Sequence, residues 1–278
     1  MTFKDILVHV DDAKSCPARL EVAVNLALRH DAHLIGLHVR PLLRLPGVLA
    51  PDFGGRMAQL QEQYSEESAA LALSLFQKAV GKNGVRNEWR DIPGDAIDIV
   101  TLHARHADLA VVGQVDIDGS DAPGDRHLPD QLALDAGIPV LVIPSVGRYP
   151  EIGKRVLIAW NGSREARRAV GDAMPFLSAA NAVKVLAINP KDGENGHGDI
   201  AGADICLHLA RHDIKATCES IRAPDLGVGS MLLSRAADDG ADLLVMGAYG
   251  RSRLSELVLG GATRHILQHM TLPVLFSH

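Results

Sequence analysis

The feature that most constrains the fold of this chain is an internal repeat. Lys4–Val8 (KDILV) corresponds to Lys154–Ile158 (KRVLI), 150 residues further along. Ala107–Gly113 (ADLAVVG) corresponds to Ala241–Gly247 (ADLLVMG), 134 residues further along. Self-similarity between the two halves of a 278-residue chain indicates a tandem duplication. We therefore expect one structural unit to be built twice, as residues 1–147 and residues 151–278.

The first half alternates apolar runs with segments of helical spacing. The runs that predict strands are Phe3–Val10, Leu34–Val39, Val85–Arg90, Leu109–Val112 and Val140–Ile143. The segments that predict helices are one that begins after Ser15 as its N-cap, then Met57–Val80 and Ala96–His106, with a long loop over residues 41–56. Strands that alternate with helices predict an α/β fold, with parallel strands, right-handed crossovers and helices on both faces.

The two halves differ in length. The displacements of 150 and 134 differ by 16 residues, which we attribute to the long loop and helix after the second strand of the first half. The second half is expected to lack them. Residues 144–153 (PSVGRYPEIG) are rich in proline and glycine and predict a linker between the halves.

The second half carries glycines between a strand and a helix. Gly247 and Gly250 follow the apolar run Leu243–Met246, and the pair Gly260-Gly261 opens a helical pattern. Glycine lets the backbone approach a ligand closely, and the N–H groups at the start of a helix have no partner within the helix. This arrangement is a natural site for an anion, so the stretch predicts a phosphate-binding site. Tight-turn geometry without a ligand is the alternative.

The glycine spacing resembles that of a known family. G-x2-G-x9-G, followed by Gly261 and then Thr263, is similar to the ATP-binding motif of the universal stress protein family. In that family the last glycine is usually followed by Ser or Thr, and here Gly261 takes that position. The resemblance covers both halves. It implies two tandem, doubly wound, five-stranded parallel-sheet domains, Rossmann-like and adenine nucleotide alpha hydrolase-like.

The resemblance also implies which residues bind the ligand. They are Asn161, Gly247, Gly250, Arg251, Gly260, Gly261, Ala262 and Thr263. Asn161 stands where the family commonly carries an Asp that meets the adenine or the ribose. The implied ligand is ATP, with ADP, AMP and a bound Mg²⁺ left open. Two alternatives also stay open: Thr263 as a first-turn helix residue, and Arg251 as a solvated loop residue.

The first half does not keep the same residues. By the displacement of 134, Gly250 corresponds to Asp116 and Gly260 to Arg126. A carboxylate repels a phosphate, and any β-carbon obstructs close approach of the backbone to a ligand. The first half is therefore expected not to hold a triphosphate in the family manner. A structural role, or recognition of another ligand, is open for it.

The resemblance implies a stress-response protein that binds an adenine nucleotide and acts as a signalling or interaction module. One alternative is an interaction protein that has lost nucleotide binding. The other is an enzyme that hydrolyses ATP or transfers adenylyl groups. The chain has no G-x-x-x-x-G-K-[ST], G-x-S-x-G or H-R-D motif, so no activity beyond weak ATP hydrolysis is expected. The pairs His208/His212 and His265/His269 lack further ligands and predict surface histidines rather than a metal site.

Composition bears on location and partners. A net charge of −6 and a pI near 6.1 give no electrostatic reason to expect nucleic acid. No apolar run approaches the roughly 18 residues of a membrane span. The N-terminal segment carries Asp5 and begins a strand, so a secretion signal is not expected. Three cysteines without a C-x-x-C motif suit a reducing compartment, which predicts a cytoplasmic location.

Each half ends in an apolar run, Pro139–Ile143 and Pro273–Phe276. An exposed apolar sheet edge promotes aggregation and needs a cover. Because the duplicate edge is the nearest partner, we expect the two closing strands to pair and form an internal pseudo-dimer. A homodimer of whole chains is the further expectation.

Overall fold

The structure is a computed structural model that describes residues 2–41, 51–81, 84–115, 127–190, 201–249 and 261–278. The first half consists of β1 (Asp5–His9), α1 (Cys16–His30), β2 (His33–Pro41), α2 (Pro51–Val80), β3 (Asn87–Gly94), α3 (Ala96–Ala104), β4 (Leu109–Gly113), α4 (Leu128–Asp135) and β5 (Val140–Ile143). The second half consists of β6 (Arg155–Ala159), α5 (Arg164–Asp172), α6 (Met174–Leu177), β7 (Ala182–Ile188), α7 (Ala203–Ala210), β8 (Ala216–Ile221), α8 (Val228–Asp238), β9 (Leu243–Gly247), α9 (Gly261–His269) and β10 (Val274–Ser277).

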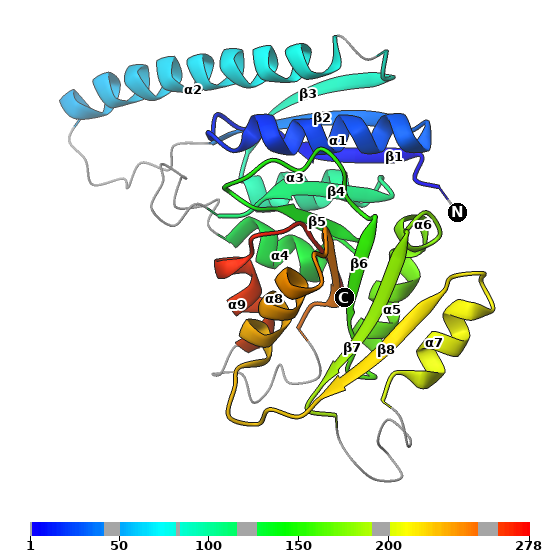
Figure 1. The fold of residues 1–278 in the computed structure, drawn as a ribbon. Coiled ribbons are helices and arrows are strands. Elements are labelled where there is room, and N and C mark those ends of the chain that lie inside the picture. The colour runs from blue at the N-terminus through cyan, green and yellow to red at the C-terminus, as the bar shows by residue number, and fades with distance from the viewer. Residues whose placement is uncertain (1, 42–50, 82–83, 116–126, 191–200, 250–260) are drawn as a thin grey trace.

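The strands form one ten-stranded sheet in the order β3-β2-β1-β4-β5-β10-β9-β6-β7-β8 (Figure 1). Within each half the five strands are parallel, and the order reverses direction between β1 and β4 and between β6 and β9. This is the predicted doubly wound arrangement, present twice. The carboxyl ends of the strands at these two reversal points are where such folds bind ligands.

The two halves join through their closing strands. β5 and β10 pair antiparallel, with Val140 opposite Phe276 and Val142 opposite Val274. All four side chains are fully buried. The predicted pairing of the two apolar edges is therefore confirmed, and each half covers the edge that the other would expose.

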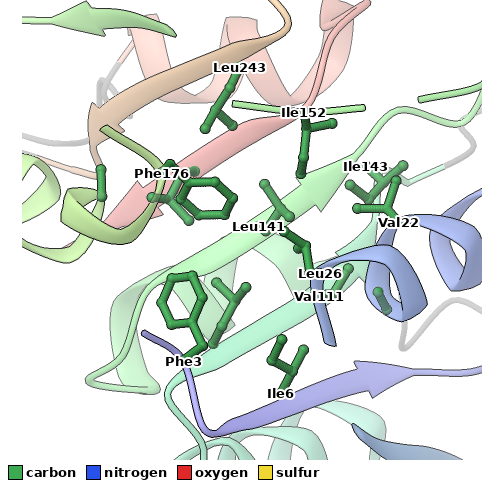
Figure 2. Close-up of a cluster of buried hydrophobic side chains, with 14 of the residues drawn as sticks. Phe3, Ile6, Val22, Leu26, Val111, Leu141, Ile143, Ile152, Phe176 and Leu243 are labelled. Atoms are coloured by element: carbon green, nitrogen blue, oxygen red, sulfur yellow. The ribbon is translucent and has the colours of Figure 1, made fainter. Parts of the chain in front are cut away.

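Helices cover both faces of the sheet, as predicted. One core contains side chains from α1, α2, α5, α6 and α7, and the other contains side chains from α3, α4, α8 and α9. Both cores run across the junction of the halves. In the first core, Phe3 lies beside Phe176 from the other half, with ring centroids 5.5 Å apart (Figure 2). Because each core is shared, the halves pack as one body.

Some sequence predictions are wrong in detail. The predicted loop 41–56 ends early, because α2 already begins at Pro51, and proline is tolerated in the first turn of a helix. The third strand is shifted to Asn87–Gly94. The second half does not lack the helix after its second strand: α7 stands there, with 8 residues against 30 in α2. The difference in length comes largely from a shortened helix.

The N-caps of the first helix in each half also differ. Ser15 precedes α1 as predicted, but its side chain makes no cap hydrogen bond and its backbone is already in the αR region. Ser163 precedes α5 with extended backbone, and its Oγ accepts from the N–H of Ala166 at 3.1 Å. Among the described residues, no helix combines the length and apolar composition that a bilayer span requires.

Candidate functional site

A cavity of about 220 Å³ lies where the strand order of the second half reverses. The residues that line it follow β6 and β9 or begin α5 and α9, with apolar side chains from β7 and α8. They are Ala159, Trp160, Asn161, Ser163, Glu165, Ala166, Leu186, Ile188, Val228, Leu232, Met246, Gly247, Tyr249, Gly261, Ala262 and Thr263. The lining is mostly apolar, with a few polar groups, as in many small-molecule sites.

Five of the predicted site residues line this one cavity. They are Asn161, Gly247, Gly261, Ala262 and Thr263. They come from segments about 100 residues apart in sequence, and the fold brings them together at the carboxyl ends of β6 and β9. Gly250, Arg251 and Gly260 lie outside the residues that the structure describes.

Gly261 begins α9 at the cavity. No atom of the described residues lies within 4 Å of a Cβ added at Gly261, and Gly261 is exposed. The first N–H groups of a nine-residue helix therefore stand beside the cavity, where they and the helix dipole favour negative charge. This is the arrangement that the glycine spacing predicts for a phosphate.

Gly247 lines the cavity and also has a packing role, while its contact with a ligand stays a prediction. A Cβ added at Gly247 would lie 2.6 Å from the amide nitrogen of Ala166, a backbone atom of α5. The missing side chain is required by close packing of the helix on the strand. Gly247 therefore lines the cavity because β9 ends there, while its conformational freedom is not needed, since its φ is not positive.

Asn161 forms a local turn. Its Oδ1 accepts from the N–H of Ser163 at 3.1 Å, and this turn leads into the capped start of α5. Its counterpart Asp11 makes the same turn with Ala13, also at 3.1 Å. The oxygen of Asn161 is thus engaged in the turn, and its Nδ2 donors are the groups left to face a ligand.

Thr263 is buried in the first turn of α9. Its Oγ1 accepts from the N–H of Tyr249 at 3.4 Å, which links the start of α9 to the end of β9. The hydroxyl keeps one donor hydrogen. Both sequence readings of Thr263, a helix residue and a ligand contact, therefore stay compatible with its position.

Glu165 is a cavity residue that the sequence reasoning missed. Only 4% of it is exposed, and its Oε2 is buried without a hydrogen-bond partner among the described residues. Burial acts to raise the pKa of its carboxyl, but hydrogen bonding by its own amide and by Ser163, and the charge of Arg164, leave the pKa below its usual range. A buried acidic residue is therefore part of the cavity lining, and its Oε1 accepts from Arg164 Nε at 3.2 Å. An acidic residue just after an N-cap serine looks like an ordinary first-turn residue in sequence, so no signal marked it.

The corresponding place in the first half has a smaller cavity with other lining residues. A cavity of about 80 Å³ lies at the ends of β1 and β4, and buried Arg19 reaches into it. Arg19 Nη2 donates to Asp11 at 2.6 Å, and its Nη1 lies where a Cβ of Gly113 would stand. Burial acts to raise the pKa of Asp11, but the charges of Arg19 and His9, together with hydrogen bonds from Arg19 and Ala13, lower it below its usual range. An ion pair therefore lies against Gly113, where the equivalent Gly247 of the second half has the start of α5 against it.

The histidine pairs lie on shared faces, as their spacing predicts. Ring centroids are 4.9 Å apart for His208 and His212 and 4.3 Å apart for His265 and His269. The described part of the chain has no group of three or more His, Cys, Asp or Glu side chains arranged to hold a metal ion.

Comparison with known proteins connects these features. A universal stress protein from Archaeoglobus fulgidus shares the fold over 98% of this chain and 95% of its own, with 15% sequence identity and a TM-score of 0.72. A protein of unknown function from Pseudomonas aeruginosa shares it over 99% of this chain and 92% of its own, with 16% identity and a TM-score of 0.59. No curated protein matches the chain. The family model described as the universal stress protein family matches residues 2–144 and 210–278, which is most of the sequence, and the chain belongs to that family.

Proposed function

We propose that this protein binds an adenine nucleotide, ATP in the first place, through its second half and acts as a stress-response signalling or interaction module. The observation that carries the proposal is the cavity beside Gly261. There the start of α9 borders the cavity, and Asn161, Ala262 and Thr263 line the same cavity. In this proposal residues 151–278 form the nucleotide-binding domain, and residues 1–147 form a domain without that activity.

The charges around the cavity suggest how the nucleotide lies. The phosphates belong at the start of α9, where the helix dipole and first-turn N–H groups, which have no partner within the helix, favour anions. The buried carboxylate of Glu165 would repel a phosphate but accept hydrogen bonds from sugar hydroxyls or a base amino group. The nucleoside part therefore belongs on the α5 side of the cavity.

We propose that binding, rather than rapid turnover, is the function. Among the described residues that line the cavity there is no histidine, cysteine or lysine, so the lining lacks a cysteine or lysine nucleophile and a histidine base. A conformational signal then depends on the nucleotide being bound and released. Whether Mg²⁺ accompanies the phosphates is left to the binding experiment, run with and without the ion.

The test uses the full chain and two variants of Gly261. Gly261→Asp places a negative charge where the phosphates belong, while an acidic residue at a helix start does not weaken the helix. Gly261→Asn has nearly the same shape without the charge. Calorimetry with ATP, ADP and AMP should show binding to the unmodified protein, loss of binding in Gly261→Asp, and a much smaller effect in Gly261→Asn.

Other outcomes distinguish the alternatives. Equal binding by Gly261→Asp and the unmodified protein would overturn the placement of the phosphates. Absence of binding by the unmodified protein, with no small molecule found bound after purification by mass spectrometry, would favour an interaction protein that has lost its ligand. Rapid release of ADP or pyrophosphate from ATP would favour an enzyme.

A further inference from the structure

A tyrosine of the nucleotide cavity is held by the other half of the chain. Tyr249 lies just after β9 and lines the cavity, and its hydroxyl donates to Oδ1 of Asp130. Asp130 belongs to the first turn of α4, in the first half. The helices α4 and α9 lie side by side where the halves meet (Figure 1). A residue of one half thus contacts a residue that lines the cavity of the other.

The backbone of Tyr249 adopts a conformation that needs support. Its φ is +45°, in the left-handed region that residues other than glycine seldom occupy. Its side chain is fixed by Asp130, and its N–H donates to Thr263 Oγ1 at 3.4 Å. Because surrounding contacts maintain strained residues of this kind, the bond to Asp130 stabilises a conformation that the local sequence alone disfavours. The position of Tyr249 also determines where its backbone N–H, which donates to Thr263, lies.

A second contact holds α9 from the same side. Gln114, which follows β4 in the first half, donates from Nε2 to the carbonyl of Leu267 in α9 at 2.9 Å. Its Oε1 accepts from the N–H of Ser145 at 3.0 Å, so the side chain is itself fixed. The first half therefore contacts the end of β9 through Asp130 and the later part of α9 through Gln114. These two elements flank the cavity.

We propose that Asp130 is a positioning residue for the nucleotide site: it acts through Tyr249 to hold the end of β9 and the start of α9 in their binding geometry. This inference rests on the proposed function. It gives the first half, whose own smaller cavity is lined by the Arg19–Asp11 pair, a role in the site of the second half. Coupling is reciprocal, so a nucleotide bound at the second half must in turn stabilise the contact with α4.

The test is a double-mutant cycle in the full chain. Tyr249→Phe removes the hydroxyl and leaves the Asp130–His127 contact intact, whereas Asp130→Ala removes the acceptor. Each single variant should bind ATP about tenfold more weakly. The double variant should bind no more weakly than the weaker single variant, because both changes remove one interaction. Asp130→Asn, which keeps an acceptor oxygen, should recover part of the affinity.

Asp135→Ala is the matched control, since Asp135 is an exposed acid on the same helix, and its affinity should equal that of the unmodified protein. A second measurement needs no nucleotide: the N–H of Tyr249 should exchange with solvent faster in Asp130→Ala than in Asp135→Ala.

Each outcome decides the question. Unchanged ATP affinity in Tyr249→Phe and Asp130→Ala, or losses that add independently in the double variant, would overturn the proposal. If the unmodified protein binds no nucleotide, the proposed function fails by itself. The exchange of the Tyr249 N–H then still tests whether Asp130 positions this residue, and an unchanged rate would overturn that too.

Discussion

Individual residues of the two cavities show that glycines of one motif can meet different requirements, close packing in one case and an exposed helix start in another. Gly247 is small because a helix backbone lies against it, whereas Gly261 is exposed at the start of a helix. In the first half, Gly113 is small because a guanidinium lies against it. The aligned glycines Gly113 and Gly247 thus both serve close packing, whereas Gly261, among the described residues, has no such neighbour.

The first prediction compares the two glycines of the second half. Gly247→Ala forces a Cβ to within 2.6 Å of backbone atoms of α5, so the free energy of unfolding should fall by about 1–3 kcal/mol. Gly261→Ala meets no atom of the described residues and should leave the free energy of unfolding nearly unchanged. Denaturant unfolding of both variants provides the measurement. A similar small effect in both would mean that α5 does not pack on β9 as described.

The second prediction concerns His9, which is buried at the end of β1. Burial lowers the pKa of His9 from 6.5 to about 4, with Arg19 and His38 acting in the same direction and Asp11 against it. As the pH falls, His9 therefore binds a proton near pH 6.5 in the unfolded chain but only near pH 4 in the folded protein. The contribution of His9 to stability is complete above pH 6.5 and is lost as the pH falls toward 4.

Between pH 7 and pH 5 this linkage should lower the free energy of unfolding by about 2 kcal/mol. His9→Gln cannot take up the proton, so its stability should fall by that much less over the same range. Denaturant unfolding at both pH values, in parallel for the two proteins, measures the difference. Parallel pH profiles would show that His9 titrates normally in the folded protein.

At the scale of elements, the helices of the two halves have diverged more than the strands. The closing strands β5 and β10 have 4 residues each, whereas α2 and α7, which occupy equivalent places, have 30 and 8. The helix starts have diverged as well, since Ser163 caps α5 and Ser15 does not cap α1. Strand positions are fixed by neighbours on both sides, whereas a helix on the surface tolerates changes in length.

The third prediction follows from these helix starts. Ser163→Ala removes the acceptor for the N–H of Ala166 and should lower the free energy of unfolding by about 1 kcal/mol. Ser15→Ala is the control at the equivalent place, and it should change stability by less than about 0.5 kcal/mol because no cap bond is lost. Thermal unfolding of both variants measures the contrast. An equal loss in the two would show that Ser15 caps α1 in solution.

For the whole molecule, the antiparallel pairing of β5 and β10 turns two sheets into one. The contacts beside it are also shared, since Arg29 Nη1 donates to the carbonyl of Ile152 at 2.8 Å and Arg168 Nη2 to that of Gly137 at 2.7 Å. An internal pair of this kind covers the closing edges without a second chain. A homodimer of whole chains stays a prediction.

The fourth prediction tests that pairing. Val140→Lys together with Val274→Lys places two charges in fully buried positions of the junction, which costs several kcal/mol. Small-angle scattering should show a larger, more extended particle. Val146→Lys, at a residue 81% exposed just after β5, is the control and should scatter like the unmodified protein. Two independently tumbling lobes in the unmodified protein would contradict the single sheet.

The sequence by itself determined the repeat, the α/β class, the closing strands and the stretch from β9 to α9, which contributes to the cavity. These follow from local patterns, because a buried strand needs a continuous apolar run and a helix start beside a ligand needs small residues. The predicted residues Asn161, Gly261, Ala262 and Thr263 line one cavity for that reason. Gly250, Arg251 and Gly260 remain predictions.

Only the tertiary structure decided which groups meet across the fold. Glu165 lines the cavity, Arg19 lies over Gly113, and Asp130 holds Tyr249 from 119 residues away. None of these has a local pattern, because each depends on how far one element is rotated and shifted against another. The energy of such contacts lies in burial and in the pairing of charges, which arise only when distant segments pack together.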